Sequence, residues 1–344
     1  MQKLARTRWL RRIAILCAAL LISALYPKHT GAQQSDVTFR TATNLVLVDV
    51  VALNNGLPEK NLKRDDFRLL DNGVPVPIKT FDSGAEFKTR PLALWFIVLC
   101  NMQGHFDETY GSGLFRGETH LLQPALTHME KQDAVGVAHW CDDGQSKLDL
   151  PPTSNAEEAV TALEHILEPV PDTESHDRSG ELALQRTMQF IIDATRSSKP
   201  EPLPVLIFLY GDHSGMPKSE ANHFVDELLE TSAIAFGIRD SRSHHMIFLI
   251  GEQKEVAHYI TDQTGGQYLD AAPGTYATAL DEILQQLHFR YELGFQPPVL
   301  DGKRHKLVVK FTDPAASRYK TVRLRYRAAY VPVAHAHLQG QGAH

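Results

Sequence analysis

The sequence predicts an α/β fold: a mostly parallel central sheet with helices on both faces, plus a small antiparallel β lobe built from N- and C-terminal segments. Residues 92–99 and 205–210 are apolar at every position, as strands buried on both faces are. Such runs alternate with segments whose apolar residues recur at helical spacing, which favours a covered parallel sheet. Segments at both ends instead show strand patterns separated by turn residues, which favours antiparallel pairing.

Residues 1–32 have the layout of a secretory signal peptide. Five Lys or Arg residues precede the apolar run 13–25, and small residues lead to a cleavage position after Ala32. The run is shorter than a membrane span, although an uncleaved N-terminal anchor is the alternative. We therefore expect a secreted or periplasmic protein, and no later apolar run is long enough to cross a membrane.

Charge argues against nucleic acid as a partner. Hydrophobic residues make up 43% and charged residues 22% of the chain, which is ordinary globular usage. After removal of residues 1–32, the chain contains 29 of its 35 Lys and Arg residues and all 41 Asp and Glu residues. Its net charge is then about −12. A chain this acidic lacks the basic footprint of a nucleic-acid binder.

An N-terminal β subdomain is predicted over residues 33–87. A long β-branched run at 44–53 is followed by the turn Asn54-Asn55-Gly56. A second Asn-Gly pair, at 72–73, separates two strand-like runs, the second being 74–81, and indicates a hairpin because both turn residues need positive φ. The prolines within the second run place it at a sheet edge.

The α/β domain is predicted over residues 88–290. Its strands are expected at 92–99, 134–140, 145–150, 205–210, 234–238, 246–250 and 267–270, and its helices at 118–131, 156–168, 180–197, 218–231, 252–264 and 276–288. Gly265-Gly266 would cap the fifth of these helices at its C-terminus.

The C-terminal segment 291–332 again has a β pattern. Strands are expected at 290–296, 304–312 and 319–330, with turns at Pro297-Pro298 and Asp313-Pro314. They would pair with the N-terminal β subdomain in one lobe. The His- and Gly-rich tail 333–344 is expected to be disordered.

Several stretches together resemble an acidobacterial family related to the von Willebrand factor A (vWA) domain. The opening reads TFRTATNLVLVDVVALNNGLP and NLKRDDFRLLDNGVPVPIKTF, the middle ALWFIVL, DAVGVAHW, PVLIFLYGDHSG and AIAFGIRD, and the end LDEILQQLHFRYELGFQPP, DGKRHKLVVKF and LRYRAAYVP. The resemblance covers nearly all of the chain after residue 32. It implies a vWA-like, Rossmann-like fold in an exported protein–protein interaction or adhesion module.

The metal-ion-dependent adhesion site that the resemblance implies is degenerate in this sequence. The family pattern is Asp-x-Ser-x-Ser after the first strand, a Thr in a later loop and an Asp after the fourth strand, whose oxygens hold Mg²⁺. Here Asn101, Gln103 and His105 stand at the first element, no Thr stands in the loop 176–181, and Asp212 is the one retained acid. A divalent cation would therefore be held weakly, with Asp212 as its candidate ligand.

The ligand-binding rim is expected in the loops at the carboxyl ends of the strands, where open α/β sheets bind ligands. The rim candidates are Asn101, Gln103, His105, Asp142, Asp212 and His213. The alternative, of equal weight, is that these loops are simple polar turns without a binding role. A zinc site is a further alternative, built from His105, His139, Cys141, Asp212 and His213, although only His139 and Cys141 have a suggestive spacing.

A disulfide between Cys100 and Cys141 is predicted, because each cysteine ends a strand and the two strands are neighbours in a vWA sheet. Neighbouring strands lie ~4.8 Å apart, within the reach of a disulfide if the side chains converge. Two buried thiols are the alternative.

Enzymatic activity is not expected. The segment Gly211-Asp212-His213-Ser214-Gly215 contains the residue types of a hydrolase triad, but consecutively and without the Gly-x-Ser-x-Gly elbow. The predicted function is therefore binding of a protein partner, without a cofactor. A structural scaffold of a cell-envelope assembly is the first alternative, and a Ser/His hydrolase centred on His213 and Ser214 the second.

Overall fold

The computed structural model describes residues 45–83, 90–99, 122–141, 145–166, 179–197, 202–209, 218–240, 256–272 and 274–332. All of them belong to one compact unit. Within these ranges, no helix is both long and apolar enough to cross a membrane.

The central sheet has six strands in the order β11-β10-β9-β6-β7-β8. The strands are β6 (Leu92–Leu99), β7 (Ala134–Trp140), β8 (Ser146–Thr153), β9 (Leu203–Leu209), β10 (Ile234–Asp240) and β11 (Tyr268–Ala271). All neighbouring pairs are parallel except β7 and β8, which form an antiparallel edge. The prediction of a mostly parallel sheet is therefore confirmed.

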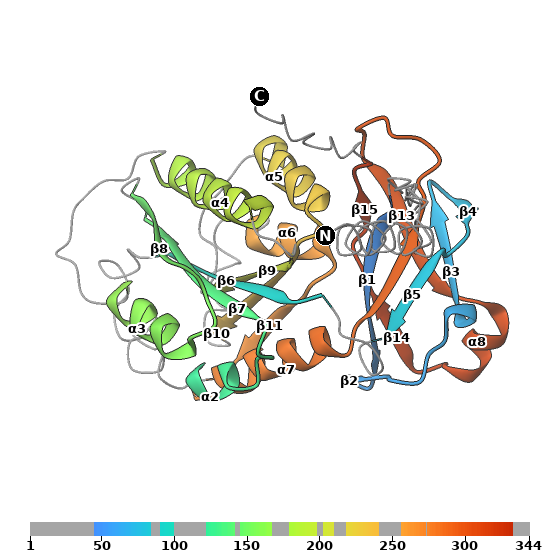
Figure 1. Ribbon diagram of the computed structural model, residues 1–344, viewed down its shortest axis with the longest axis horizontal. Coiled ribbons are helices and arrows are strands. Elements are labelled where there is room, and N and C mark those ends of the chain that lie inside the picture. Colours follow the sequence, from blue (N-terminus) through green and yellow to red (C-terminus); the bar gives the residue numbers. More distant parts are fainter. Residues whose placement is uncertain are drawn as a thin grey trace, which may run out of the picture. The chain divides into compact units, whose positions relative to one another are not determined.

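Helices cover both faces of this sheet (Figure 1). One face carries α2 (Leu122–Leu126), α3 (Ala156–Ile166) and α7 (Tyr276–His288), and the other carries α4 (Ser179–Ser197), α5 (Lys218–Glu230) and α6 (Val256–Thr264). In β6, Phe96 packs into the first core and Trp95 into the second. Burial on both sides explains why this strand is apolar at every position.

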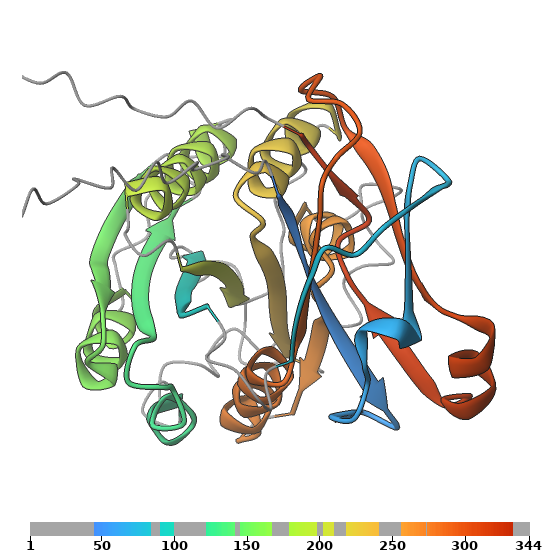
Figure 2. The ribbon, with the colours of Figure 1, turned by 45° about the vertical axis from the view of Figure 1, so that its right-hand side comes forward.

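The N- and C-terminal segments pair with each other in two antiparallel sheets, which we call the β lobe. One sheet has the order β14-β1-β12-β5, with β2 added to β1, and the other has the order β15-β13-β3-β4. Figure 2 shows the blue N-terminal strands beside the red C-terminal ones. The strands are β1 (Val46–Asn54), β2 (Leu57–Pro58), β3 (Phe67–Asp71), β4 (Val74–Val76), β5 (Thr80–Ser83), β12 (Tyr291–Phe295), β13 (His305–Phe311), β14 (Val322–Arg325) and β15 (Ala329–Tyr330).

The core of the β lobe lies between its two sheets. Phe67 of β3 contacts Tyr291 of β12, with ring centroids 5.5 Å apart, and both side chains are buried. The Tyr291 hydroxyl donates to the carbonyl of Glu59 and accepts the N–H of Leu62, and burial raises the pKa of Tyr291 to about 12. This core joins residues more than 200 positions apart in the sequence.

Four sequence expectations need correction. The strand expected at 319–330 forms two short strands, because β14 pairs with β1 whereas β15 pairs with β13 in the other sheet. The single run expected at 74–81 forms two strands, because β4 pairs with β3 whereas β5 crosses to β12 in the other sheet. The turn expected at Asp313-Pro314 begins a short helix, α8 (Asp313–Arg318), since proline is favourable in a first helical turn. The helix expected at 118–131 is described only as α2, followed by turns, while the strand expected at 246–250 lies outside the described residues.

Candidate functional site

The candidate site is the carboxyl-end switch point of the central sheet, where the strand order reverses and where open α/β sheets form a binding crevice. From β6 the chain proceeds to β7 and β8 on one side, and from β9 to β10 and β11 on the other. β6 and β9 are parallel neighbours, with Val98 in register with Leu209, so both strands end at the same edge. In open α/β sheets this switch point is where ligands bind.

The predicted rim residues follow the strands that end at this crevice. Asn101, Gln103 and His105 follow β6, and Asp212 and His213 follow β9. Asp142 follows β7. All six lie outside the described residues, so their role in a binding rim stays a prediction.

Beside this switch point, β7 and β8 hold a polar cluster, of which the sequence pointed only to His139. His139 Nδ1 lies 2.6 Å from Asp149 Oδ2, and their side chains are only 15% and 10% exposed. Lys147 Nζ lies 3.4 Å from the other Asp149 oxygen. A carboxylate at an imidazole nitrogen fixes the orientation of the ring. His139, considered above as a zinc ligand, is thus held by Asp149.

Helix α4 also contacts this cluster. The Thr187 hydroxyl is fully buried and donates to the backbone carbonyl of His139 over 3.0 Å. A helix residue thereby fixes the end of β7 next to the crevice. The one sequence signal for the cluster is the alternation of polar and apolar residues at 147–150, which places Lys147 and Asp149 on the same face of β8.

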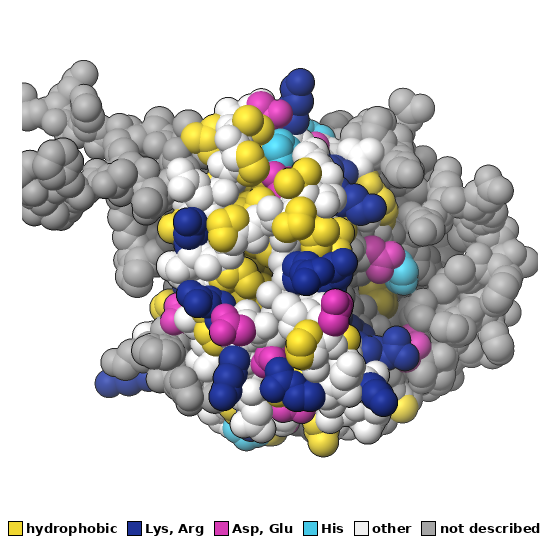
Figure 3. All heavy atoms as spheres, turned by 90° about the vertical axis from the view of Figure 1, so that its right-hand side faces the viewer, with side chains coloured by type: hydrophobic (Ala, Val, Ile, Leu, Met, Phe, Trp, Pro, Cys, Tyr) yellow, Lys and Arg dark blue, Asp and Glu magenta, His cyan; other side chains and the backbone are white. Residues whose placement is uncertain are grey.

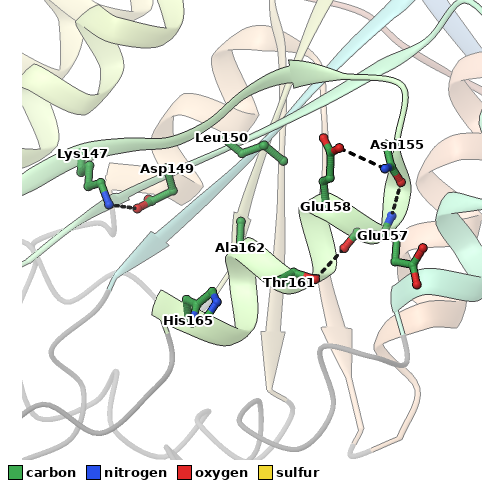
Figure 4. A pocket seen from close by; sticks show the side chains of 9 residues that line it. All are labelled: Lys147, Asp149, Leu150, Asn155, Glu157, Glu158, Thr161, Ala162 and His165. Carbon is green, nitrogen blue, oxygen red and sulfur yellow. Dashed lines mark hydrogen bonds and ion pairs between the residues drawn. The ribbon is translucent and has the colours of Figure 1, made fainter.

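A groove of about 580 Å³ continues from Asp149 along β8 and α3 (Figure 4). Its lining residues are Lys147, Asp149, Leu150, Asn155, Glu157, Glu158, Thr161, Ala162 and His165. The Asn155 side chain accepts the N–H of Glu157 and donates to the Glu158 carboxylate, which caps the start of α3. Glu157 and Glu158 also complement the helix dipole at this end.

Cys141 is buried and disulfide-bonded. The other predicted cysteine, Cys100, lies outside the described residues, so the Cys100–Cys141 pairing stays a prediction. As for a metal, no group of three or more His, Cys, Asp or Glu residues in the described ranges is arranged to hold one.

Comparison with known proteins adds little beyond this geometry. No protein-family model and no curated protein matches the chain. An aerotolerance-related membrane protein from Bacteroides fragilis NCTC 9343 is 12% identical, with a TM-score of 0.40 over 57% of this chain and 98% of its own. BatB from Bacteroides thetaiotaomicron is 13% identical, with a TM-score of 0.39 and the same coverage. A von Willebrand factor type A protein from Catenulispora acidiphila is 9% identical, with a TM-score of 0.40 over 85% of this chain and 74% of its own. Superpositions this loose define neither family nor partner.

Proposed function

We propose that this protein is an exported vWA-type module that binds a protein partner through the loops following β6, β7 and β9. The observation that supports this most is the strand order, in which β6 and β9 run side by side and the chain departs from them in opposite directions. In open α/β sheets such a reversal forms a ligand-binding crevice at the carboxyl ends of the strands, and the predicted rim residues directly follow these strand ends in the sequence.

Recognition at this rim would rest on shape and polar contacts, with the metal-ion-dependent adhesion site degenerate. Asn101 and Gln103 offer neutral carbonyl oxygens where a vWA metal site has charged or hydroxyl oxygens. Calcium and magnesium sites in proteins use negatively charged carboxylates to bind the cation. Asp212 alone would hold a divalent cation only weakly.

Partner capture tests the proposal. The full exported chain, immobilised, should retain a partner from the native cell envelope with and without a divalent-metal chelator. Alanine at Asn101, Gln103, His105 and Asp212 together should reduce capture about ten-fold or more, because a few central residues dominate protein interfaces. The matched control replaces Lys131 and Gln132, two exposed residues at the opposite end of β7.

Two outcomes would contradict the proposal. If the fourfold variant captures the partner as well as the control variant does, the rim does not bind the partner, and the result favours the structural scaffold alternative. If the chelator abolishes capture, the rim holds a functional cation and the site is not degenerate.

The proposed disulfide has its own test. Leu99 of β6 is in register with Trp140 of β7, so we expect Cys100 and Cys141 to be the next pair along the two strands. Peptide mapping without reductant should recover these two cysteines in one cross-linked peptide. Labelling of Cys100 by a thiol reagent in the folded protein would exclude the pairing.

A further inference from the structure

The described residues divide into two parts of opposite charge. The β lobe, over 45–83 and 289–332, contains 15 Lys and Arg residues and 9 Asp and Glu residues. The described residues of the central sheet and its helices contain 7 basic residues and 17 acidic ones. The chain is acidic overall, but its β lobe is basic. The β lobe should therefore attract acidic surfaces, and the central part should attract basic ones.

The outward surface of β13, β3 and β4 concentrates this basic charge. The inward residues of β13 and β3, such as Val309 and Leu69, are buried, so the alternate residues face outward. The outward residues are Arg68, Leu70, Pro75, Lys306, Val308 and Lys310, which we call the basic face. Three of the six are basic, three are apolar and none is acidic. Figure 3 shows basic and hydrophobic side chains interspersed on this side of the molecule, with some acidic side chains among them.

The basic face contains a like-charge pair that an isolated molecule does not neutralise. Arg68 and Lys310 are direct register partners on neighbouring antiparallel strands, and both are exposed. Like charges directly opposite each other destabilise a sheet. Among the described residues, no ion pair involves Arg68, Lys306 or Lys310. An anionic surface laid on this face would remove that repulsion, and Leu70 and Val308 offer apolar contact between the charges.

The groove on β8 and α3 has the complementary chemistry. Glu157 and Glu158 supply exposed carboxylates, whereas the Asp149 carboxylate is already paired with His139 and Lys147. Leu150 of β8 and Ala162 of α3 supply apolar lining. Figure 1 places β8 and α3 at one end of the described unit and β3 and β4 at the other. The basic face and this acidic groove therefore cannot meet within one molecule.

We infer that the partner of the basic face is a second copy of this chain, whose acidic groove it occupies. The contact is head-to-tail, because it joins two different surfaces, and such contacts build rings or open chains of copies. The opposite charges of the two surfaces, each with apolar side chains among the charged ones, carry this assignment. It does not involve the loops after β6, β7 and β9, so its failure would leave the proposed function intact.

The test uses the full exported chain and two charge-reversal variants. Sedimentation velocity should show association that strengthens with protein concentration and disappears in about 1 M salt, where the Debye length is ~3 Å. Arg68→Glu with Lys310→Glu, and separately Glu157→Lys with Glu158→Lys, should each weaken association about 100-fold or more. Mixing the two variants should restore association, because each retains one native surface and the reversed surfaces also match.

The matched control for the Arg68 and Lys310 reversal is Lys320→Glu with Arg323→Glu. It makes the same change in net charge at exposed positions outside the basic face. It should associate as the unmodified chain does, and thermal unfolding should confirm that all variants fold. A monomer at every concentration in low salt would overturn the inference, as would a mixture that stays monomeric. Flotation with vesicles of anionic phospholipid covers the other source of anions. Binding that the Arg68 and Lys310 reversal abolishes, in a chain that stays monomeric, would assign the basic face to a membrane surface instead.

Discussion

Replacing Asp49 by alanine is expected to lower the free energy of unfolding by about 3–5 kcal/mol, the cost of leaving buried charges without their partner. The Asp49 side chain is 4% exposed and accepts hydrogen bonds from two arginines. Arg290 Nε lies 2.8 Å from one of its oxygens, and Arg90 Nη2 lies 2.9 Å from the other. Arg290 is itself 1% exposed, so water cannot replace the lost carboxylate.

This ion pair joins the β lobe to the central sheet. Besides Asp49 of β1, Arg290 contacts the carbonyls of Leu287, at the end of α7, and Arg90, just before β6. The loss of Asp49 should therefore loosen the point at which the chain enters the sheet and leaves it. Denaturant unfolding followed by circular dichroism would measure the effect.

The matched control is Asp65→Ala, because Asp65 is 90% exposed and pairs only with Arg64 on the surface. Its loss should change stability by less than about 0.5 kcal/mol. Asp49→Asn, which keeps the size and the oxygen acceptor, should fall between the two. Equal stability of the Asp49→Ala and Asp65→Ala variants would show that the buried pair does not hold the lobe.

Glu292 gives the same experiment a pH readout. Burial, and then the neighbouring Asp49 carboxylate, raise the pKa of Glu292 above its ordinary value of 4.5. The folded state therefore keeps the Glu292 proton to higher pH than the unfolded state does. As pH rises from the unfolded-state pKa of Glu292 to its folded-state pKa, this group's contribution to the free energy of unfolding falls. Without Asp49, the nearby Arg90 and Arg290 should lower the pKa of Glu292, and that fall in stability should shrink.

The central sheet could be predicted from the sequence because burial on both faces leaves a visible pattern. The runs at 92–99 and 205–210 became β6 and β9, with the described side chains of both strands buried. The Asn-Gly turns were equally legible, since Asn72 and Gly73 have φ values of 47° and 85° between β3 and β4. These features are local, so a short window of sequence contains them.

The ion pairs of the described residues could not be predicted in the same way. His139 and Asp149 meet across β7 and β8, whose register shifts near Val137 and is not set by any residue pattern. Asp49 was visible only as a lone acid in a β-branched run, and its partner Arg290 lies 241 residues further along. Contacts of this range follow from the tertiary arrangement. The predicted rim residues lie outside the described residues, so their assignment rests on the sequence and the strand order alone.

Replacing Gly266 by alanine is expected to destabilise the protein by about 3 kcal/mol, because the added Cβ would overlap backbone atoms. Helix α6 ends at Thr264, Gly265 has a φ of 86°, and the Gly266 N–H donates to the Thr261 carbonyl over 3.1 Å, which closes a Schellman cap. The Cβ would meet the carbonyl of Ala235 on β10.

Relief by local movement would itself disturb the sheet. The Ala235 N–H donates to the Thr264 hydroxyl over 2.9 Å, and the Gly237 N–H donates to the Gln267 carbonyl over 3.0 Å. Hydrogen bonds therefore join this segment to β10 on both sides of Gly266. The matched control is Gly274→Ala, where φ is 78° but nothing lies within 4 Å of the added Cβ. It should cost only the backbone strain of about 1 kcal/mol. Equal loss of stability in the two variants, measured by denaturant unfolding, would mean that β10 and the α6 cap do not approach as closely as described. A larger loss at Gly266 would show that this glycine is required by the approach of β10 to the helix end, whereas Gly274 is required only by its positive φ.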